Sequence, residues 1–490
     1  MTAATAQRAA DLDEGAKRRA FAVSIAVAVL TILDLSKVNV ALPSIDRALG
    51  AGPTELQIIV AGYALAFGLA LVPGGRLGDV LSRRTMFLVG LTVFTVFSLL
   101  CALAPSAGLL LAARFLQGIG AGLQMPQVLG IAQELYQGES RARAFGAYGA
   151  SVGVGTALGP TIGGALILLG GEQDGWRAIF WMNVPLGALL LVLAMRVLPR
   201  EPKRDHRESL DPLGVGLLGT TVVAFMLPFV LTTGQPGDSP WRWLFLLAAA
   251  ALLAAFVAWE RRYRESGRTP AVDVQLFRRR SYRNGILVAT AWFAAGPATF
   301  LLNTLFLQEG LGLAPVFAGM VTIPFAIASA ASSYTAGRLV SRYGRALVVV
   351  GLVVALVGFA ATLTAAVLSP PAWAPWLMAA ALLIAGAGGG SVVSPNQTLT
   401  LSEVPVAKGG VAASVGQVGQ RVGTAIGVAG ASAVFFSLLN ADLGGARLAD
   451  YHLAVLGGGG LAFLILLAAL GFALADLVAR RRDPDPAVAR

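Results

Sequence analysis

Fourteen apolar runs divide this sequence, and they constrain its fold more than any other feature. A bilayer core is crossed by roughly 20 apolar residues in helical form. The predicted spans are residues 20–42, 56–73, 85–104, 107–131, 145–169, 179–197, 212–232, 243–259, 284–307, 315–336, 346–368, 373–395, 411–438 and 453–475. The segments between them are too short to fold as separate soluble domains. The sequence therefore predicts an all-α polytopic membrane protein.

The composition supports this interpretation. Apolar residues make up 56% of the chain and charged residues 13%, and the mean hydropathy is +0.73. A soluble globular protein carries about 25% charged residues. These values exclude a soluble enzyme, a disordered protein and a collagen-like fibre.

The basic residues are distributed very unevenly between the two sides of the predicted membrane. If the amino terminus is cytoplasmic, the inner segments hold 30 of the 37 Lys and Arg residues, and the outer segments hold four. This is the positive-inside pattern, and it favours fourteen spans with both termini in the cytoplasm. It also accounts for the net charge of +11 without nucleic acid as a partner.

Metal and redox sites are not expected. The single cysteine, Cys101, lies in an apolar run, and the two histidines, His206 and His452, are far apart in predicted loops. No intramolecular disulfide or thiolate metal site can be assembled from these residues. We therefore expect no metal and no cofactor.

An internal repeat organises the chain. Residues 75–83 and 337–345 align without gaps at an offset of 262, and each segment follows an inward-going span. Many secondary transporters are built from such repeated halves. The predicted organisation is an N-tail (1–19), a six-helix bundle (20–197), a linker with two additional helices and a basic loop (198–283), a second six-helix bundle (284–478) and a C-tail (479–490).

Four ionised residues lie well inside predicted spans: Asp34, Lys37, Arg114 and Arg421. Such residues are costly in lipid and are candidates for a functional site. Asp34 lies about 12 Å, and Arg114 about 10 Å, below the outer ends of their spans, so a contact between them is allowed. Lys37 shares the helical face of Asp34. The cluster is either a set of static ion pairs or a site where Asp34 changes its protonation during transport.

Glycines follow one face of the fifth predicted span. Gly155, Gly159, Gly163 and Gly164 allow close approach of a neighbouring helix. Pro160 removes a backbone hydrogen bond and makes this helix bendable. Near the span ends, Glu134 and Glu309 are interpreted as solvated.

Five motifs are spread over most of the chain, from Leu33 to Gly427. They are Leu33-Asp34 with Val38-Asn39-Val40-Ala41-Leu42-Pro43; Gly75-Arg76-Leu77-Gly78-Asp79 with Arg83-Arg84; Leu110, Arg114, Gln117 and Gly118; Gly155, Gly159, Pro160, Gly163 and Gly164; and Gln420-Arg421-Val422-Gly423 with Gly427. Together these motifs resemble the major facilitator superfamily, and within it the fourteen-span drug:proton antiporters.

The resemblance implies a role for each group of residues. A proton-coupling and substrate cavity would contain Asp34, Lys37, Asn39, Arg114, Gln117 and Arg421. A cytoplasmic gating motif would contain Gly75, Asp79, Arg83 and Arg84, with Gly337, Arg338 and Arg345 in the second copy. The span-5 glycines and Pro160 would form the antiporter helix motif.

The sequence departs from the family pattern at several positions. Lys37 stands where an aliphatic residue is usual, so coupling or substrate charge can differ from the multidrug members. Ser341 stands where the first repeat has Asp79. We call the contacts of this motif that hold the cytoplasmic side closed a latch, and the change from Asp to Ser predicts a weaker latch in the second copy. In the first copy, we expect the Asp79 carboxylate to accept hydrogen bonds from a neighbouring helix N-terminus or to pair with a base.

The function predicted first is proton-coupled export of amphipathic small molecules or drugs (multidrug efflux) by alternating access. An alternative is a dedicated exporter of an endogenous, anionic metabolite or lipid, and a membrane enzyme or channel is the third reading. The expected location is the inner (plasma) membrane, with lipid, protons and a small-molecule substrate as partners and the monomer as the functional form. Four aromatic residues either line an apolar substrate-binding cavity or pack in a hydrophobic core: Trp292, Phe293, Phe300 and Phe306.

Overall fold

The computed structural model describes residues 13–51, 53–171, 174–199, 211–231, 239–268, 270, 272, 274–405, 409–439 and 447–482. Several predicted features lie outside these residues. They are the first part of the N-tail (1–12), the linker segment 200–210 with His206, the basic residue Lys408 and the end of the C-tail (483–490).

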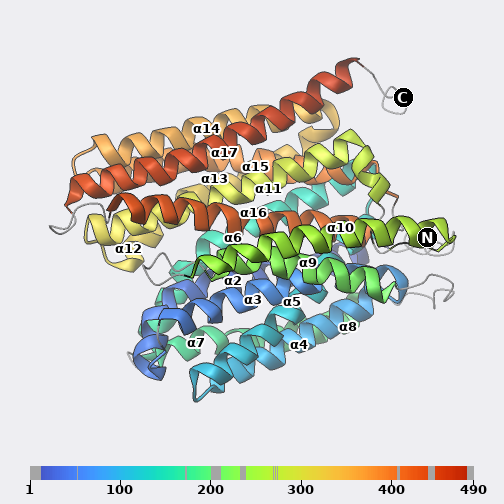
Figure 1. Ribbon diagram of the computed structural model, residues 1–490, viewed down its shortest axis with the longest axis horizontal. Coiled ribbons are helices and arrows are strands. Elements are labelled where there is room, and N and C mark those ends of the chain that lie inside the picture. Colours follow the sequence, from blue (N-terminus) through green and yellow to red (C-terminus); the bar gives the residue numbers. More distant parts are fainter. Residues whose placement is uncertain are drawn as a thin grey trace. The chain divides into compact units, whose positions relative to one another are not determined.

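The described residues form helices joined by short connections, without a strand (Figure 1). The helices are α2 (Glu14–Leu49), α3 (Pro53–Val80), α4 (Arg83–Leu103), α5 (Ala107–Leu135), α6 (Gly138–Gly170), α7 (Gly175–Trp181), α8 (Asn183–Val197), α9 (Pro212–Val230), η1 (Pro240–Trp243), α10 (Leu244–Glu265), η2 (Val274–Arg278), α11 (Arg280–Leu305), η3 (Phe306–Gly310), α12 (Pro315–Met320), α13 (Ile323–Tyr343), α14 (Arg345–Leu368), α15 (Ala374–Ser402), α16 (Gly409–Leu439) and α17 (Leu448–Arg482).

The all-α polytopic membrane fold is confirmed. Among the described residues, 12 helices are long and apolar enough to cross a membrane, or 13 if the bent helix α6 is one span. A helix also covers most of each predicted run, but α5, with Arg114 and several glutamines, is not among the 12 or 13. Fourteen spans and cytoplasmic termini therefore stay predictions.

The chain divides into two compact units. Unit 1 comprises Met1–Gln137, Gly155–Val274 and Pro405–Val422, and unit 2 comprises Gly138–Val154, Gln275–Val404 and Gly423–Arg490. Helices α6 and α16 each contribute one part to each unit. The predicted boundaries of the two six-helix bundles stay predictions.

The same glycine pattern supports one central helix in each unit. On α5 of unit 1, Gly118 and Gly122 contact α3, and Gly120 contacts α4. On α15 of unit 2, Gly386 and Gly390 contact α13, and Gly388 contacts α14. Residues i and i+4 share a helix face, whereas i+2 lies on nearly the opposite one. A glycine on each face lets two neighbours approach closely, so both units repeat one packing design.

Two prolines shape the helices around the candidate site. Pro160 lacks the N–H that would bond the carbonyl of Thr156, and α6 bends by 40° between Thr156 and Leu158. Pro185 likewise cannot bond the carbonyl of Trp181, and α7 ends at that residue. The next helix, α8, therefore begins at Asn183.

The two additional helices, α9 and α10, pack against each other and α9 packs on α3. Gly68 of α3 accommodates Val222 and Met226, and Gly219 of α9 accommodates Leu69. Much of α10 is exposed, including Leu247, which suits a helix that faces lipid.

Candidate functional site

The centre of unit 1 holds a buried ion pair between α2 and α5. Nη1 of Arg114 lies 2.8 Å from Oδ2 of Asp34, and neither side chain is exposed. This contact was expected from the matched depths of the two residues, and the structure confirms it. Burial of an ion costs several kcal/mol unless a partner compensates, so the pair holds α2 and α5 in one arrangement.

Lys37 joins this cluster one turn further along α2. Its Nζ lies 3.5 Å from Oδ1 of Asp34, and the side chain is fully buried. The predicted shared face of Asp34 and Lys37 is confirmed. The closer partner of Nζ is Oδ1 of Asn183, at 2.6 Å.

Asn183 is a member of the cluster that our sequence interpretation missed. Its Nδ2 donates to Oδ1 of Asp34 at 2.6 Å and to Oγ of Ser98 at 3.3 Å. The available signal was an asparagine in an apolar run two residues before Pro185. An amide carries no charge, so Asn183 lacks the signal that marks Asp34, Lys37 and Arg114 as candidates for a functional site.

Polar and aromatic groups surround the guanidinium of Arg114. Nη1 also donates to Oε1 of Gln117 at 2.7 Å, and Nε2 of Gln117 donates to Oγ of Ser98 at 2.7 Å. The Tyr63 ring lies 4.1 Å from Cζ of Arg114, and the Phe180 ring lies 5.6 Å away. An aromatic face attracts a desolvated cation. The predicted site residue Gln117 is thus in direct contact with Arg114.

The glycines of the antiporter motif pack directly on α2 beside the cluster. Gly155 lies against Ile32, Gly159 against Ser36 and Gly163 against Lys37. In addition, Oγ of Ser36 donates to the carbonyl of Gly155 at 3.1 Å. A Cβ at Gly159 or Gly163 would collide with α2, and one at Gly155 would be tightly packed against Ile32. Gly164 is also buried, and Pro160 is partly buried at the bend of α6.

Two predicted cavity residues lie apart from the ion cluster. Arg421 on α16 is partly buried, and its Cζ lies 4.6 Å from the Phe67 ring on α3. Asn39 is exposed on α2. Of the six predicted cavity residues, the structure brings four together: Asp34, Lys37, Arg114 and Gln117.

A second cluster of unit 1 surrounds Asp79 at the end of α3. Its Oδ1 lies 2.9 Å from Nη2 of Arg83. Its two oxygens also accept from the backbone N–H of Gly410, at 3.3 Å, and of Val411, at 2.9 Å. These residues begin α16, where unpaired N–H groups and the helix dipole favour an anion. The predicted contact with a helix N-terminus is confirmed, and Gly75 permits it by packing on Gly410 and Ser414.

Arg83 begins α4 and connects Asp79 with α5. It is buried, donates to the carbonyl of Gly130, and its Nη1 lies 3.4 Å from Oε1 of Glu134. The interpretation of Glu134 as a solvated helix end was wrong, because only 12% of its side chain is exposed and it pairs with this arginine. Arg84 donates to the carbonyl of Met195 at 2.8 Å, and Glu309 is exposed as expected.

The second copy of the motif has different partners. Arg345 is the counterpart of Arg83, and its Nε lies 2.5 Å from Oδ2 of Asp476 on α17. Its Nη1 donates to Oδ1 of Asn396 on α15 at 2.5 Å. Ser341, the counterpart of Asp79, is exposed. Both Asp476 and Asn396 belong to unit 2, as does Arg345.

Two other residues of the second copy were predicted to take part in gating, Arg338 and Gly337. Arg338 is exposed, with its Cζ 4.4 Å from the Tyr334 ring. Gly337 contacts Ala142 and Gly146 of α6 within unit 2.

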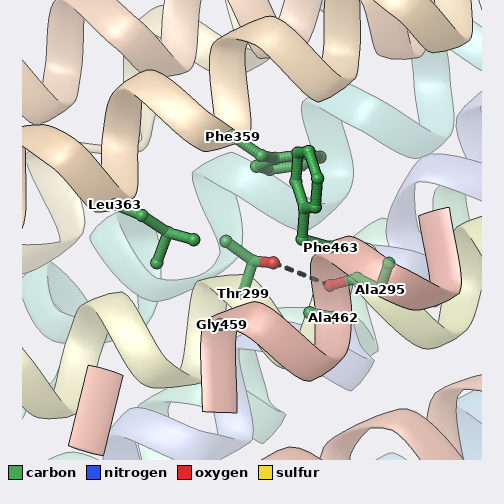
Figure 2. Close-up of a pocket in the computed structure, with 7 residues that line it drawn as sticks. All are labelled: Ala295, Thr299, Phe359, Leu363, Gly459, Ala462 and Phe463. Carbon is green, nitrogen blue, oxygen red and sulfur yellow. Dashed lines mark hydrogen bonds between the residues drawn. The ribbon is translucent and has the colours of Figure 1, made fainter. Parts of the chain in front are cut away.

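Unit 2 contains a small apolar cavity between α11, α14 and α17 (Figure 2). Its only lining hydroxyl, on Thr299, donates to the carbonyl of Ala295 at 2.9 Å. The other lining residues are Phe359, Leu363, Gly459, Ala462 and Phe463. None of the four predicted cavity aromatics lines it; Trp292 and Phe306 are buried in the core of unit 2, and Phe293 and Phe300 pack against that core.

The comparisons with known proteins agree with these features. Residues 24–428 match the Major Facilitator Superfamily. The chain is 34% identical over 424 residues, 86% of this chain and 73% of the relative, to a probable actinorhodin transporter of Streptomyces coelicolor. It is 35% identical over 410 residues, 83% of this chain and 79% of the relative, to a puromycin resistance protein of Streptomyces alboniger.

Among solved structures, the proton:xylose symporter XylE, a major facilitator protein, matches with a TM-score of 0.63 at 17% identity. The match covers 94% of this chain and 97% of the symporter. At this identity the likeness concerns the fold alone. The sequence match covers most of the chain, from α2 to α16, and this protein therefore belongs to the major facilitator superfamily.

Proposed function

We propose that this protein is a proton-coupled exporter of amphipathic small molecules or drugs in the cell membrane. The supporting observation is the buried cluster of Asp34, Lys37 and Arg114 in unit 1. Charges so costly to bury are retained in membrane proteins mainly where ions or substrates pass. The Asp34 carboxylate can exchange a proton, whereas arginine keeps its charge.

The relatives support the export direction. Their names concern an actinorhodin transporter and resistance to puromycin, and export of a toxic compound is a direct route to resistance. We infer that the chain works as a monomer, without catalytic chemistry, cofactor or nucleic acid, and that alternating access of the two units moves the substrate.

The alternative is export of an anionic metabolite or lipid, and one observation favours it. The ionised cluster carries one carboxylate and two cations, and Arg421 adds a further positive charge in the same unit. In addition, Nε and Nη2 of Arg114 find no hydrogen-bond acceptor among the described residues. A substrate with an acceptor or an acidic group would satisfy them.

Proton release from proteoliposomes tests both candidates. The purified chain is reconstituted under an imposed pH gradient, and cationic, neutral and anionic amphiphiles are added to wild type and to Asp34→Asn. We expect substrate-triggered proton release by wild type and its loss in the variant. The charge class that triggers release identifies the substrate class. Substrate movement without proton release in wild type would overturn proton antiport.

A further inference from the structure

The side chain of Asn183 forms hydrogen bonds with both Lys37 and Asp34 in the charged cluster. We propose that Asn183 is a positioning residue for proton coupling, whose side-chain oxygen holds the ammonium of Lys37 while Asp34 carries a proton. The inference rests on the proposed proton-coupled transport. It assigns a role in that process to a neutral side chain on α8, a helix that contributes none of the charged groups.

The orientation of the Asn183 amide follows from its partners. An ammonium only donates hydrogen bonds, so the atom 2.6 Å from Nζ of Lys37 is the amide oxygen. The amide nitrogen then faces Oδ1 of Asp34, at 2.6 Å, and Oγ of Ser98, at 3.3 Å. The amide thus lies between the two charges and bonds both of them.

The charge balance of the cluster explains why such a group is needed. With Asp34 ionised, the cluster carries a net charge of +1, and a proton on Asp34 raises it to +2. Asp34, Lys37 and Arg114 are all fully buried, so bulk water does not screen that charge. Each cation therefore needs a neutral hydrogen-bond or aromatic partner that remains in contact with it when protonation removes the negative charge of Asp34.

Both cations have such a partner. Arg114 keeps the Gln117 oxygen at 2.7 Å and the Tyr63 ring. Lys37 keeps the Asn183 oxygen at 2.6 Å, which is nearer than the carboxylate of Asp34 at 3.5 Å. Lys37 therefore keeps a hydrogen-bond acceptor when Asp34 is protonated, so Asp34 can take up and release protons without loss of the cluster.

The remaining titratable groups around Asp34 come from three other helices. Tyr63 on α3 and Cys101 on α4 both interact electrostatically with Asp34, and Arg421 on α16 interacts with Tyr63. On α6, the neighbouring residue is Gly163, which contacts Lys37 through its backbone. Of the neutral residues named around the cluster, Asn183 is the one whose side-chain oxygen accepts from Lys37.

Substitutions at Asn183 are expected to move the pH dependence of transport. In Asn183→Leu, Lys37 loses its neutral acceptor, which favours ionised Asp34, while Asp34 loses the hydrogen bond from the amide nitrogen, which favours its protonated form. The part that depends on Lys37 moves the midpoint of substrate-triggered proton release to lower pH, and it is measured as the difference between the shifts that Asn183→Leu causes with and without Lys37. In Asn183→Asp, an added negative charge favours protonation of Asp34, so the midpoint moves to higher pH, by about one pH unit or more.

A packing role for Asn183 predicts a different result. Both variants would then lose rate or protein yield together, with an unchanged midpoint, and this outcome would overturn the proposal. A matched control is Asn303→Leu, since Asn303 is also buried and intramembrane but has no hydrogen-bond partner among the described residues; its midpoint should equal that of wild type.

The dependence on Lys37 provides a second check. In a Lys37→Met background, Asn183→Leu should move the midpoint only to higher pH, because the lost hydrogen bond to Asp34 is then its one effect on the cluster. With Lys37 present, the shift should lie about one pH unit or more lower, and equal shifts in the two backgrounds would contradict the proposed contact. The failure of the proposed function looks different, because wild type would then release no protons or Asp34→Asn would keep full coupling. Coupling that Asp34→Asn abolishes, together with fixed midpoints at Asn183, refutes only the present inference.

Discussion

At the residue scale, glycines of α6 allow this helix to pack beside the charged cluster. Gly159 of α6 lies against Ser36 and the backbone of Lys37. Gly159→Val would push α6 away from α2, and overpacking of this kind costs about 1–3 kcal/mol. We expect at least a tenfold loss of transport in proteoliposomes and a lower Tm. The control substitution Gly216→Ala on α9, where an added Cβ meets nothing within 4 Å, should leave transport unchanged and should not lower the Tm.

At the same scale, the sequence predicts charged partners better than neutral ones. The contact between Asp34 and Arg114 follows from helical rise, because each residue has a defined depth in its span. Asn183 has no such signal, since its role arises only when α8 packs beside α2 and Lys37 needs an acceptor. The position of Glu134 at a span end predicts exposure to solvent. Its burial depends on a contact with Arg83, which lies 51 positions earlier in the chain and cannot be recognised from the local sequence.

At the element scale, the first copy of the repeated motif is expected to act as a latch. Asp79 accepts from the first N–H groups of α16, a charge-assisted contact that asparagine reproduces poorly. Asp79→Asn should abolish transport while membrane insertion stays intact, because Glu134 still pairs with Arg83. Transport assays and the yield of membrane-inserted protein test this; normal transport would contradict the latch.

The second copy is expected to stabilise unit 2 instead. Arg345 is buried and bonds Asp476 on α17 and Asn396 on α15. Asp476→Asn removes the negative charge from a buried pair, which costs about 3–5 kcal/mol. We expect a lower Tm in detergent and less folded protein, with unchanged proton stoichiometry in the molecules that fold. A variant with wild-type Tm and no transport would instead assign gating to this copy.

These two motifs show how far an internal repeat can be used for prediction. The offset of 262 correctly paired Arg83 with Arg345, and both arginines are buried at the start of a helix. The replacement of Asp79 by Ser341 predicted a different second copy. The partner that compensates, Asp476, lies far along the chain on α17, and no local pattern marks it.

At the scale of the whole molecule, the number of spans is the prediction that most needs a direct measurement. The chain has one cysteine, Cys101, which is buried, so Cys101→Ala provides a background for single cysteines. Fourteen spans place Ser106 and Ser239 outside the cell and Gln137 and Ser266 inside, and all four are exposed. A membrane-impermeant maleimide added to intact cells should therefore label Cys at 106 and 239 but not at 137 and 266.

The two pairs of positions separate the possible errors in the span count. Ser106 and Gln137 flank α5, the helix that carries Arg114 and is not among the 12 or 13 helices that are long and apolar enough to cross a membrane. Ser239 and Ser266 flank α10, the second additional helix. Labelling of both members of one pair from outside, or of neither, would mean that the enclosed helix does not cross the membrane. Since α5 contributes Arg114 to the buried pair with Asp34, the first pair also tests whether the proposed coupling site lies within the bilayer.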